Sequence, residues 1–213
     1  MRTFTREAQE QMRPIDAFHL LEKGNRRFQE NLRANRNLLT QMNETSDAQF
    51  PFATILSCID SRVSAELVFD QGLGDIFSIR IAGNFIDEDI LGSMEFTCKI
   101  AGSKLILVLG HTRCGAIKGA CDDLEMGHLT SVIQKLRPAV LRTKEAGDRS
   151  SENESFVDRV SETNVHLAMR HIYDRSPILQ KMIDADELAI AGGLYDVQTG
   201  AVDFFDDNIG RLH

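Results

Sequence analysis

The chain has 213 residues, of which 42% are hydrophobic and 26% are charged. These values lie near globular averages and exclude a disordered, collagen-like or low-complexity chain, and a chain of this size buries roughly 70% of its unfolded surface. The formal net charge of −8, without a basic stripe, makes nucleic acid an unexpected partner.

Three features predict where the protein works. No apolar run approaches the roughly 20 residues that a membrane-spanning helix needs, so we expect no membrane span. The first ten residues are polar and partly acidic, unlike a secretory signal. Four cysteines are too few for a disulfide scaffold, and cysteine beside histidine and aspartate suggests metal binding or catalysis. We therefore expect a cytoplasmic protein.

The amino-terminal part predicts a helix over residues 14–36. Pro14 suits the first turn, and apolar side chains follow at helical spacing. This period is lost over residues 37–49. We interpret residues 1–48 as a helical arm that covers either the main body or a partner subunit. The apolar positions of the arm are Ile15, Phe18, Leu21, Phe28 and Leu32.

From residue 51 onward, short apolar runs alternate with helical stretches, which is typical of a parallel sheet covered on both faces. Residues 187–197 and 201–205, joined by Gln198-Thr199-Gly200, predict a hairpin with an antiparallel edge strand. We therefore expect a single α/β domain, residues 1–213, whose core (49–213) has a mainly parallel central sheet flanked by helices. The predicted strands are 53–57, 76–81, 104–110 and 187–191, and the predicted helices are 64–71, 87–101, 115–126, 129–142 and 153–173.

The residues suited to metal binding or catalysis lie at two strand ends. Cys58 follows the first predicted strand, and His111 and Cys114 follow the third. Ligands of α/β sheets bind at the carboxyl ends of strands, and two thiolates with one imidazole suit a tetrahedral zinc ion. Each half of this pattern also occurs by chance in buried cores. Their placement at equivalent strand ends favours a metal site.

The same residues resemble a known family. Cys58-x-Asp60-Ser61-Arg62 together with His111-x-x-Cys114-Gly115 is similar to the zinc motif of β-class carbonic anhydrases, and the resemblance covers residues 49–124 and 192–197. It implies Zn²⁺ held by the two cysteines and the histidine. It further implies reversible hydration of CO2 to bicarbonate and a proton by zinc-bound hydroxide, in a homodimer or a multiple of dimers.

The resemblance also implies roles for neighbouring residues. Asp60, paired with Arg62, would accept a hydrogen bond from the zinc-bound hydroxide, and both are the candidate catalytic residues. In a closed state Asp60 would instead become the fourth zinc ligand. Phe77 and Phe96 could equally be ordinary core residues. The candidate substrate-binding residues are Gln49, Phe77, Phe96 and Gly115.

Two other functions remain open at this point. Relatives with this zinc site hydrolyse CS2 or COS, and a zinc protein without turnover, structural or bicarbonate-responsive, is a third hypothesis. The Asp60–Arg62 pair argues against a purely structural site, which would gain nothing from an ionised acceptor beside zinc.

One difference from the family's sequence pattern leads to a prediction about regulation by bicarbonate. Family members that bicarbonate inhibits use a tryptophan where this chain has Ile55, whereas Arg80 and Tyr195 match the rest of that pocket. The chain contains no tryptophan. We therefore expect an open zinc site at neutral to alkaline pH, the alternative being that Asp60 closes onto the metal for other reasons.

Overall fold

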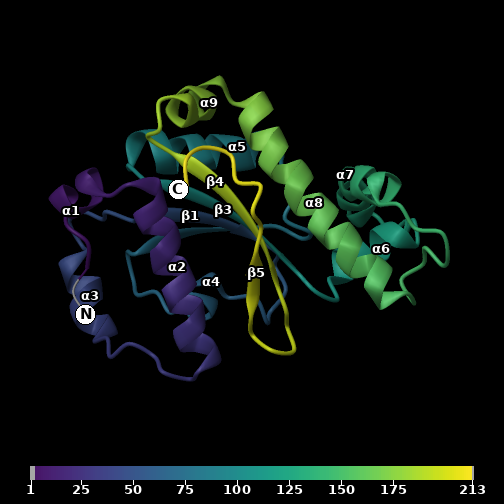
Figure 1. The fold of residues 1–213 in the computed structure, drawn as a ribbon, viewed down its shortest axis with the longest axis horizontal. Coiled ribbons are helices and arrows are strands. Elements are labelled where there is room, and N and C mark those ends of the chain that lie inside the picture. The colour runs from purple at the N-terminus through teal and green to yellow at the C-terminus, as the bar shows by residue number, and fades with distance from the viewer. Residues whose placement is uncertain (1–2, 213) are drawn as a thin grey trace.

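A five-stranded sheet runs through the centre of the computed structural model, which describes residues 3–212 (Figure 1). Its order is β2-β1-β3-β4-β5. The first four strands are parallel, and β5 runs antiparallel to β4 at one edge. The expected fold class is thereby confirmed. The strands are β1 (Ala53–Ser57), β2 (Ile76–Arg80), β3 (Leu105–His111), β4 (Ala189–Tyr195) and β5 (Val202–Phe204).

Helices cover both faces of this sheet because its central strands are apolar on both sides. Every residue of β1 and β3 is buried, whereas burial alternates along the edge strand β2. Helices α2 (Pro14–Gln29) and α4 (Ala65–Val68) lie on one face. The other face packs against α5 (Glu88–Glu95), the π-helical turn η1 (Phe96–Ile100), α8 (Glu154–Arg175) and α9 (Pro177–Asp184).

A smaller apolar cluster lies beyond the carboxyl ends of β1 and β3. It joins α6 (Gly115–Cys121), α7 (Leu129–Arg142) and the first half of α8. Figure 1 shows these helices together at one end of the molecule. Cys58 and Cys114 belong to this cluster, so the candidate metal ligands lie where the sheet meets a second packed layer.

The amino-terminal arm differs from the prediction in its boundaries. Its main helix, α2, ends at Gln29 rather than 36. Two short helices flank it: α1 (Arg6–Gln11) and α3 (Leu38–Glu44). Each begins at a polar cap, because the Thr5 and Asn37 side chains accept backbone N–H groups of the first turn. A capping side chain can start a helix even where no apolar residues recur at helical spacing. Apolar periodicity alone therefore does not predict α1 and α3.

The arm covers its own chain. Ala17 and Leu21 of α2 are completely buried against the sheet, and Ile15, Phe18 and Phe28 are partly buried against the same core, whereas Leu32 is 62% exposed. Gly24 shows how close the packing is, because a Cβ there would lie 1.8 Å from the carbonyl oxygen of Phe69. Glycine at this position lets α2 approach the end of α4.

Other predicted boundaries also shift. The helix predicted over 64–71 is only α4, and that over 115–126 ends at Cys121. The segment 87–101 divides into α5 and η1, and α9 was not predicted. The last central strand, β4, ends at Tyr195, beyond the predicted strand 187–191 but within the predicted hairpin arm 187–197. Within residues 3–212, no helix has the length and apolar character to cross a membrane.

Candidate metal centre

Three potential metal ligands converge at the carboxyl ends of β1 and β3. Cys58 directly follows β1, His111 is the last residue of β3, and Cys114 immediately precedes α6. The two strands are adjacent and parallel, which brings their ends together. One donor atom from each side chain lies within 4.8 Å of the others, and all three residues are buried. The predicted ligands are therefore brought together by the fold.

The His111 ring is oriented for coordination. Its Nδ1 lies 2.9 Å from the carbonyl oxygen of Thr112, an acceptor that places the ring proton on Nδ1. The other nitrogen, Nε2, is buried and has no hydrogen-bond partner among the described residues. A buried acceptor without a partner costs free energy unless a ligand meets it. A metal ion between Nε2 and the two sulfur atoms would satisfy this nitrogen.

The two thiols influence each other's ionisation. Their sulfur atoms are 3.9 Å apart, within hydrogen-bonding distance for sulfur. The hydrogen bond with Cys114 lowers the pKa of Cys58, whereas the hydrogen bond with Cys58, burial and the Cys58 charge raise the pKa of Cys114. The protein alone thus favours one thiolate over two. A divalent cation would stabilise the second, so the donor set fits zinc.

Asp60 lies beside this cluster and is held by Arg62. The Arg62 guanidinium donates from Nε to Oδ1 at 2.9 Å and from Nη2 to Oδ2 at 2.8 Å, and its backbone N–H donates to Oδ1 at 3.0 Å. These hydrogen bonds hold the pKa of the Asp60 carboxyl well below its usual range, against the opposing effect of burial. Asp60 Oδ2 lies 4.0 Å from Nε2 of His111. An ionised acceptor therefore borders the donor cluster.

Backbone contacts fix the segment that carries Cys58 and Asp60. Arg80, the last residue of β2, donates to the carbonyl oxygens of Cys58 at 3.1 Å and Asp60 at 2.7 Å. The backbone N–H of Gly83 donates to the Cys58 sulfur at 3.4 Å. The sequence pattern did not predict either positioning contact. A signal existed for Arg80, since a long donor side chain ends the strand next to β1.

The predicted regulatory positions can be placed in this framework. Ile55 is completely buried in β1, and Tyr195 is buried at the end of β4. The Arg80 guanidinium is engaged by the two backbone carbonyls described above. Asp60 is paired with Arg62. The open state of the metal site stays a prediction.

The candidate substrate residues fall into two groups. Gly115 is exposed next to Cys114, and a Cβ there would meet nothing within 4 Å. Gln49, in contrast, is exposed before the amino end of β1, whereas Cys58 follows its carboxyl end. Five strand residues span roughly 17 Å at 3.3 Å each. The predicted contact of Gln49 with the site is therefore not formed within one subunit.

Phe77 and Phe96 also lie away from the donors. In the strand register Phe77 pairs with Thr54, three residues before the end of β1. Together with Phe96 it lines an open cavity of about 540 Å³ over α5. Phe96 is 55% exposed, so it is not the ordinary core residue considered as its alternative. Both residues therefore border an open surface cavity of this subunit.

The remaining cysteines take no part in the cluster. Cys98 in η1 is buried, and burial raises its pKa to about 12. Cys121 is half-buried at the end of α6, and burial raises its pKa to about 11. Both remain neutral thiols near pH 7, as expected of structural cysteines.

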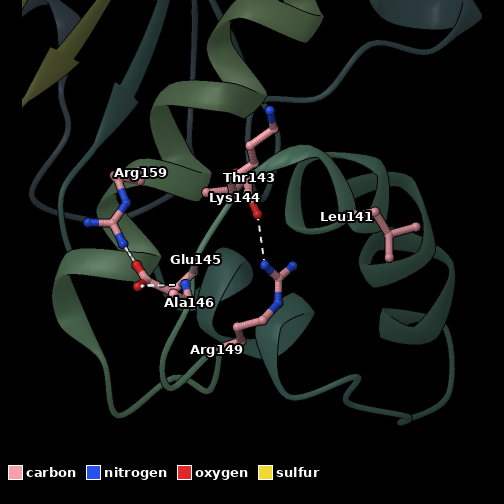
Figure 2. Close-up of a pocket in the computed structure, with 7 residues that line it drawn as sticks. All are labelled: Leu141, Thr143, Lys144, Glu145, Ala146, Arg149 and Arg159. Atoms are coloured by element: carbon pink, nitrogen blue, oxygen red, sulfur yellow. Dashed lines mark hydrogen bonds and ion pairs between the residues drawn. The ribbon is translucent and has the colours of Figure 1, made fainter.

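A large surface cavity of about 640 Å³ lies elsewhere, over the loop that follows α7 (Figure 2). Three of its charged side chains are engaged: Arg159 pairs with Glu145, and Arg149 donates to the carbonyl oxygens of Val140 and Thr143. None of the three candidate metal ligands lines it. The cavity residues are Leu141, Thr143, Lys144, Glu145, Ala146, Arg149 and Arg159.

Comparison with known proteins identifies the family. The family model for carbonic anhydrase matches residues 53–202, a range that contains all three candidate ligands and the Asp60–Arg62 pair. The chain belongs to the carbonic anhydrase family. It is 34% identical to carbonic anhydrase 2 of Mycobacterium tuberculosis over 93% of this chain and 96% of that protein. It is 36% identical to the carbonic anhydrase of Mycolicibacterium smegmatis over 89% and 92% of the two chains.

Solved structures agree with the β class. The Coccomyxa β-carbonic anhydrase, determined in complex with acetazolamide, is 25% identical with a TM-score of 0.71, covering 81% of this chain and 80% of that chain. A Sordaria macrospora structure, one of two described as tetrameric β-carbonic anhydrases, has a TM-score of 0.72 at 22% identity, covering 78% and 86%. This chain is a β-class carbonic anhydrase in family and fold.

Proposed function

We propose that the chain catalyses the zinc-dependent, reversible hydration of CO2 to bicarbonate and a proton. The observation that carries this proposal is the buried Cys58–His111–Cys114 cluster with its unpartnered His111 Nε2, beside an ionised Asp60. Family membership supports the same activity. Two thiolates and a neutral imidazole would balance the two charges of zinc and leave its fourth position open.

Each residue has a distinct part in this proposal. Zinc, when bound, supplies a Lewis acid; in carbonic anhydrases with three histidine ligands it lowers the pKa of water from 15.7 to about 7, a value that belongs to those enzymes. Asp60 accepts a hydrogen bond from the reacting water and so orients its oxygen toward CO2. Arg62 keeps Asp60 ionised and fixes its direction. Arg80 holds the backbone that carries both Cys58 and Asp60.

The substrate contacts require a second copy of the chain. Gln49, Phe77 and Phe96 do not reach the donor cluster of their own subunit, yet two of them line an open apolar cavity. We propose that these residues contribute at a subunit boundary in a homodimer or a multiple of it. The tetrameric Sordaria macrospora proteins are consistent with such assembly.

Hydrolysis of CS2 or COS remains the second candidate, because the same donor set could act on those linear molecules. No contact among residues 3–212 favours these substrates over CO2. Parallel assays of CO2 hydration and of sulfide release from CS2 and COS, with one zinc-loaded preparation, distinguish the two. Hydration without sulfide release is the expected result.

Replacement of one ligand tests the metal site. Cys114→Ser is expected to lose stoichiometric zinc and all measurable hydration, because the weakly acidic hydroxyl is a poor replacement for a thiolate. Cys98→Ser is the matched control, since that buried cysteine lies outside the cluster and should leave the zinc content unchanged. Stoichiometric zinc in folded Cys114→Ser protein would refute the ligand assignment.

A further inference from the structure

The turn between His111 and Cys114 determines how two candidate ligands face each other. Only Thr112 and Arg113 separate the end of β3 from Cys114. Arg113 has a φ of 56°, in the left-handed region that side chains with a Cβ seldom adopt. Such a conformation persists when surrounding contacts impose it. The turn must therefore be held from outside.

One side of the turn is attached to β4 and the residues after it. The backbone N–H of Thr112 donates to the carbonyl oxygen of Tyr195 at 2.9 Å. The Thr112 hydroxyl accepts the backbone N–H of Val197 at 3.2 Å. These contacts fix the residue next to His111. They leave the strained residue, Arg113, to be fixed by another element.

Helix α8 supplies that second attachment. The backbone N–H of Arg113 donates to Oδ1 of Asp158 at 2.8 Å. The Arg113 guanidinium also lies 3.3 Å from Glu154, but both side chains are about half exposed, and such surface pairs contribute little. The hydrogen bond to Asp158 involves a half-buried carboxylate and the backbone itself. Bonds to an ionised acceptor are stronger than neutral ones.

The burial of Asp158 and its acidic neighbours disfavour the ionised form of its carboxyl group. Burial and the negative charges of Glu154 and Asp196 raise its pKa, whereas the Arg113 N–H and guanidinium lower it. The contacts that compensate for this unfavourable environment come from Arg113. The Asp158 carboxylate is therefore stabilised by Arg113 of the ligand turn and not by its acidic neighbours Glu154 and Asp196.

We propose that Asp158 is a positioning residue for the metal centre, which acts by holding the Thr112–Arg113 turn and thereby the relative placement of His111 and Cys114. It touches neither ligand side chain in the described contacts and acts through the backbone of Arg113. This inference rests on the metal site of the proposed function. Its test therefore measures metal binding directly, independently of CO2 hydration.

Three variants distinguish the effect of losing the hydrogen-bond acceptor from the effect of changing the side-chain volume. Asp158→Ala and Asp158→Leu remove the acceptor, and leucine keeps a similar side-chain length where alanine could disturb folding. Asp158→Asn retains an acceptor oxygen in nearly the same shape. Glu154→Gln is the matched control, since it weakens only the exposed partner of Arg113.

Zinc affinity by chelator competition and the absorption spectrum of the Co²⁺-substituted protein are the two readouts. Asp158→Ala and Asp158→Leu should bind zinc about 10- to 100-fold more weakly, as is typical when an outer contact of a ligand is removed. Their Co²⁺ spectra should shift, because the ligand geometry changes. Asp158→Asn and Glu154→Gln should stay within about threefold of the parent protein, on the same affinity scale.

Unchanged zinc affinity and Co²⁺ spectra in folded Asp158→Leu protein would overturn the proposal, even if thermal stability fell. Equal losses in Asp158→Asn and Asp158→Leu would also overturn it, because the acceptor would then be irrelevant. A parent protein that binds zinc but does not hydrate CO2 would refute the proposed activity alone, and the affinities would still decide the role of Asp158.

Discussion

At the scale of single residues, one carboxylate beside the donor cluster is held in place by three hydrogen bonds. Three N–H groups of Arg62, two from its side chain and one from its backbone, donate to Asp60. A planar guanidinium matches a carboxylate in two parallel hydrogen bonds, which fixes direction as well as charge. Asp60 is thereby kept ionised and oriented beside the three donors.

Loss of the Arg62 guanidinium should therefore reduce catalysis without reducing metal binding. In Arg62→Ala, CO2 hydration is expected to fall about 10- to 100-fold while zinc remains stoichiometric, because Asp60 loses its orientation but the ligands are unchanged. Stopped-flow hydration and metal analysis measure the two effects. Arg137→Ala, which breaks an ion pair with Asp123 between half-exposed side chains, is the control and should leave both unaltered. Full activity in Arg62→Ala would show that another group orients Asp60.

At the scale of elements, the sheet brings the ligands together and the amino-terminal arm stabilises its far face. Helix α2 packs closely on the end of α4 through Gly24. The segment that follows α2 is held in place by a carboxylate. That carboxylate, Asp70, accepts hydrogen bonds from the side chains of Arg27 and Arg36 and from the backbone N–H of Ala34. Each contact carries a separate prediction about stability.

Gly24→Ala is expected to destabilise the protein although alanine is the better helix former. The intrinsic gain at an open helix position is about 1 kcal/mol. Here the new Cβ would lie 1.8 Å from the Phe69 carbonyl oxygen, so overpacking should cost about 1–3 kcal/mol beyond that gain. Urea unfolding measures the difference. Gly92→Ala in α5, where a Cβ meets nothing within 4 Å, is the control and should be neutral or stabilising.

Asp70 makes the stability of the arm dependent on pH. Burial raises its pKa, but the hydrogen bonds and charges of the arm outweigh this effect, so the folded-state pKa is lower than the unfolded value. The contribution of Asp70 is therefore complete well above the unfolded value of about 3.9 and is lost as pH falls through the lower folded pKa.

Urea unfolding of Asp70→Ala as a function of pH tests this linkage. At pH 7 the variant should be less stable by about 3 kcal/mol, since a buried member of an ion pair is removed. The difference should shrink as the pH falls below about 4, because the unfolded chain then binds the proton before the folded protein does. Asp174→Ala, in an exposed pair with Arg170, should show little difference at either pH. A pH-independent gap for Asp70→Ala would contradict the assignment.

At the scale of the whole molecule, the exposed apolar surface and the missing substrate contacts point in the same direction. Phe96 is 55% and Ile100 is 74% exposed, and β2 is an edge strand of the sheet. Exposed apolar residues beside an open strand edge are typical of an interface. The apolar side chains of α2, in contrast, pack mainly against the sheet of their own chain.

The parent protein is expected to have a mass of twice the chain, or a multiple of that. Phe96→Asp should shift it toward monomers that keep zinc but hydrate CO2 poorly, because a charge enters the proposed boundary and the partner contacts are lost. Light scattering at micromolar concentration, with metal analysis, measures this. Leu141→Asp, which alters another exposed apolar residue, on α7, is the control. A fully active monomeric parent protein would contradict the subunit boundary.

The sequence by itself determined the alternation of strands and helices and the three candidate ligands. Apolar runs at strand length and their following Cys58, His111 and Cys114 are local patterns, and parallel strands bring their carboxyl ends together. Helix ends were less certain, because α1 and α3 depend on single caps rather than on a period. The cytoplasmic location stays a prediction.

Only the tertiary structure decided which residues support the site. Arg80, Gly83 and Asp158 reach the ligand segments from other elements, through hydrogen bonds in which one partner is a backbone group. The structure also placed Phe77 and Phe96 on an outer surface rather than beside the donors of their own subunit. Sequence spacing describes neighbours along the chain, whereas these contacts depend on how separate elements pack, and their physical origin lies in three-dimensional proximity.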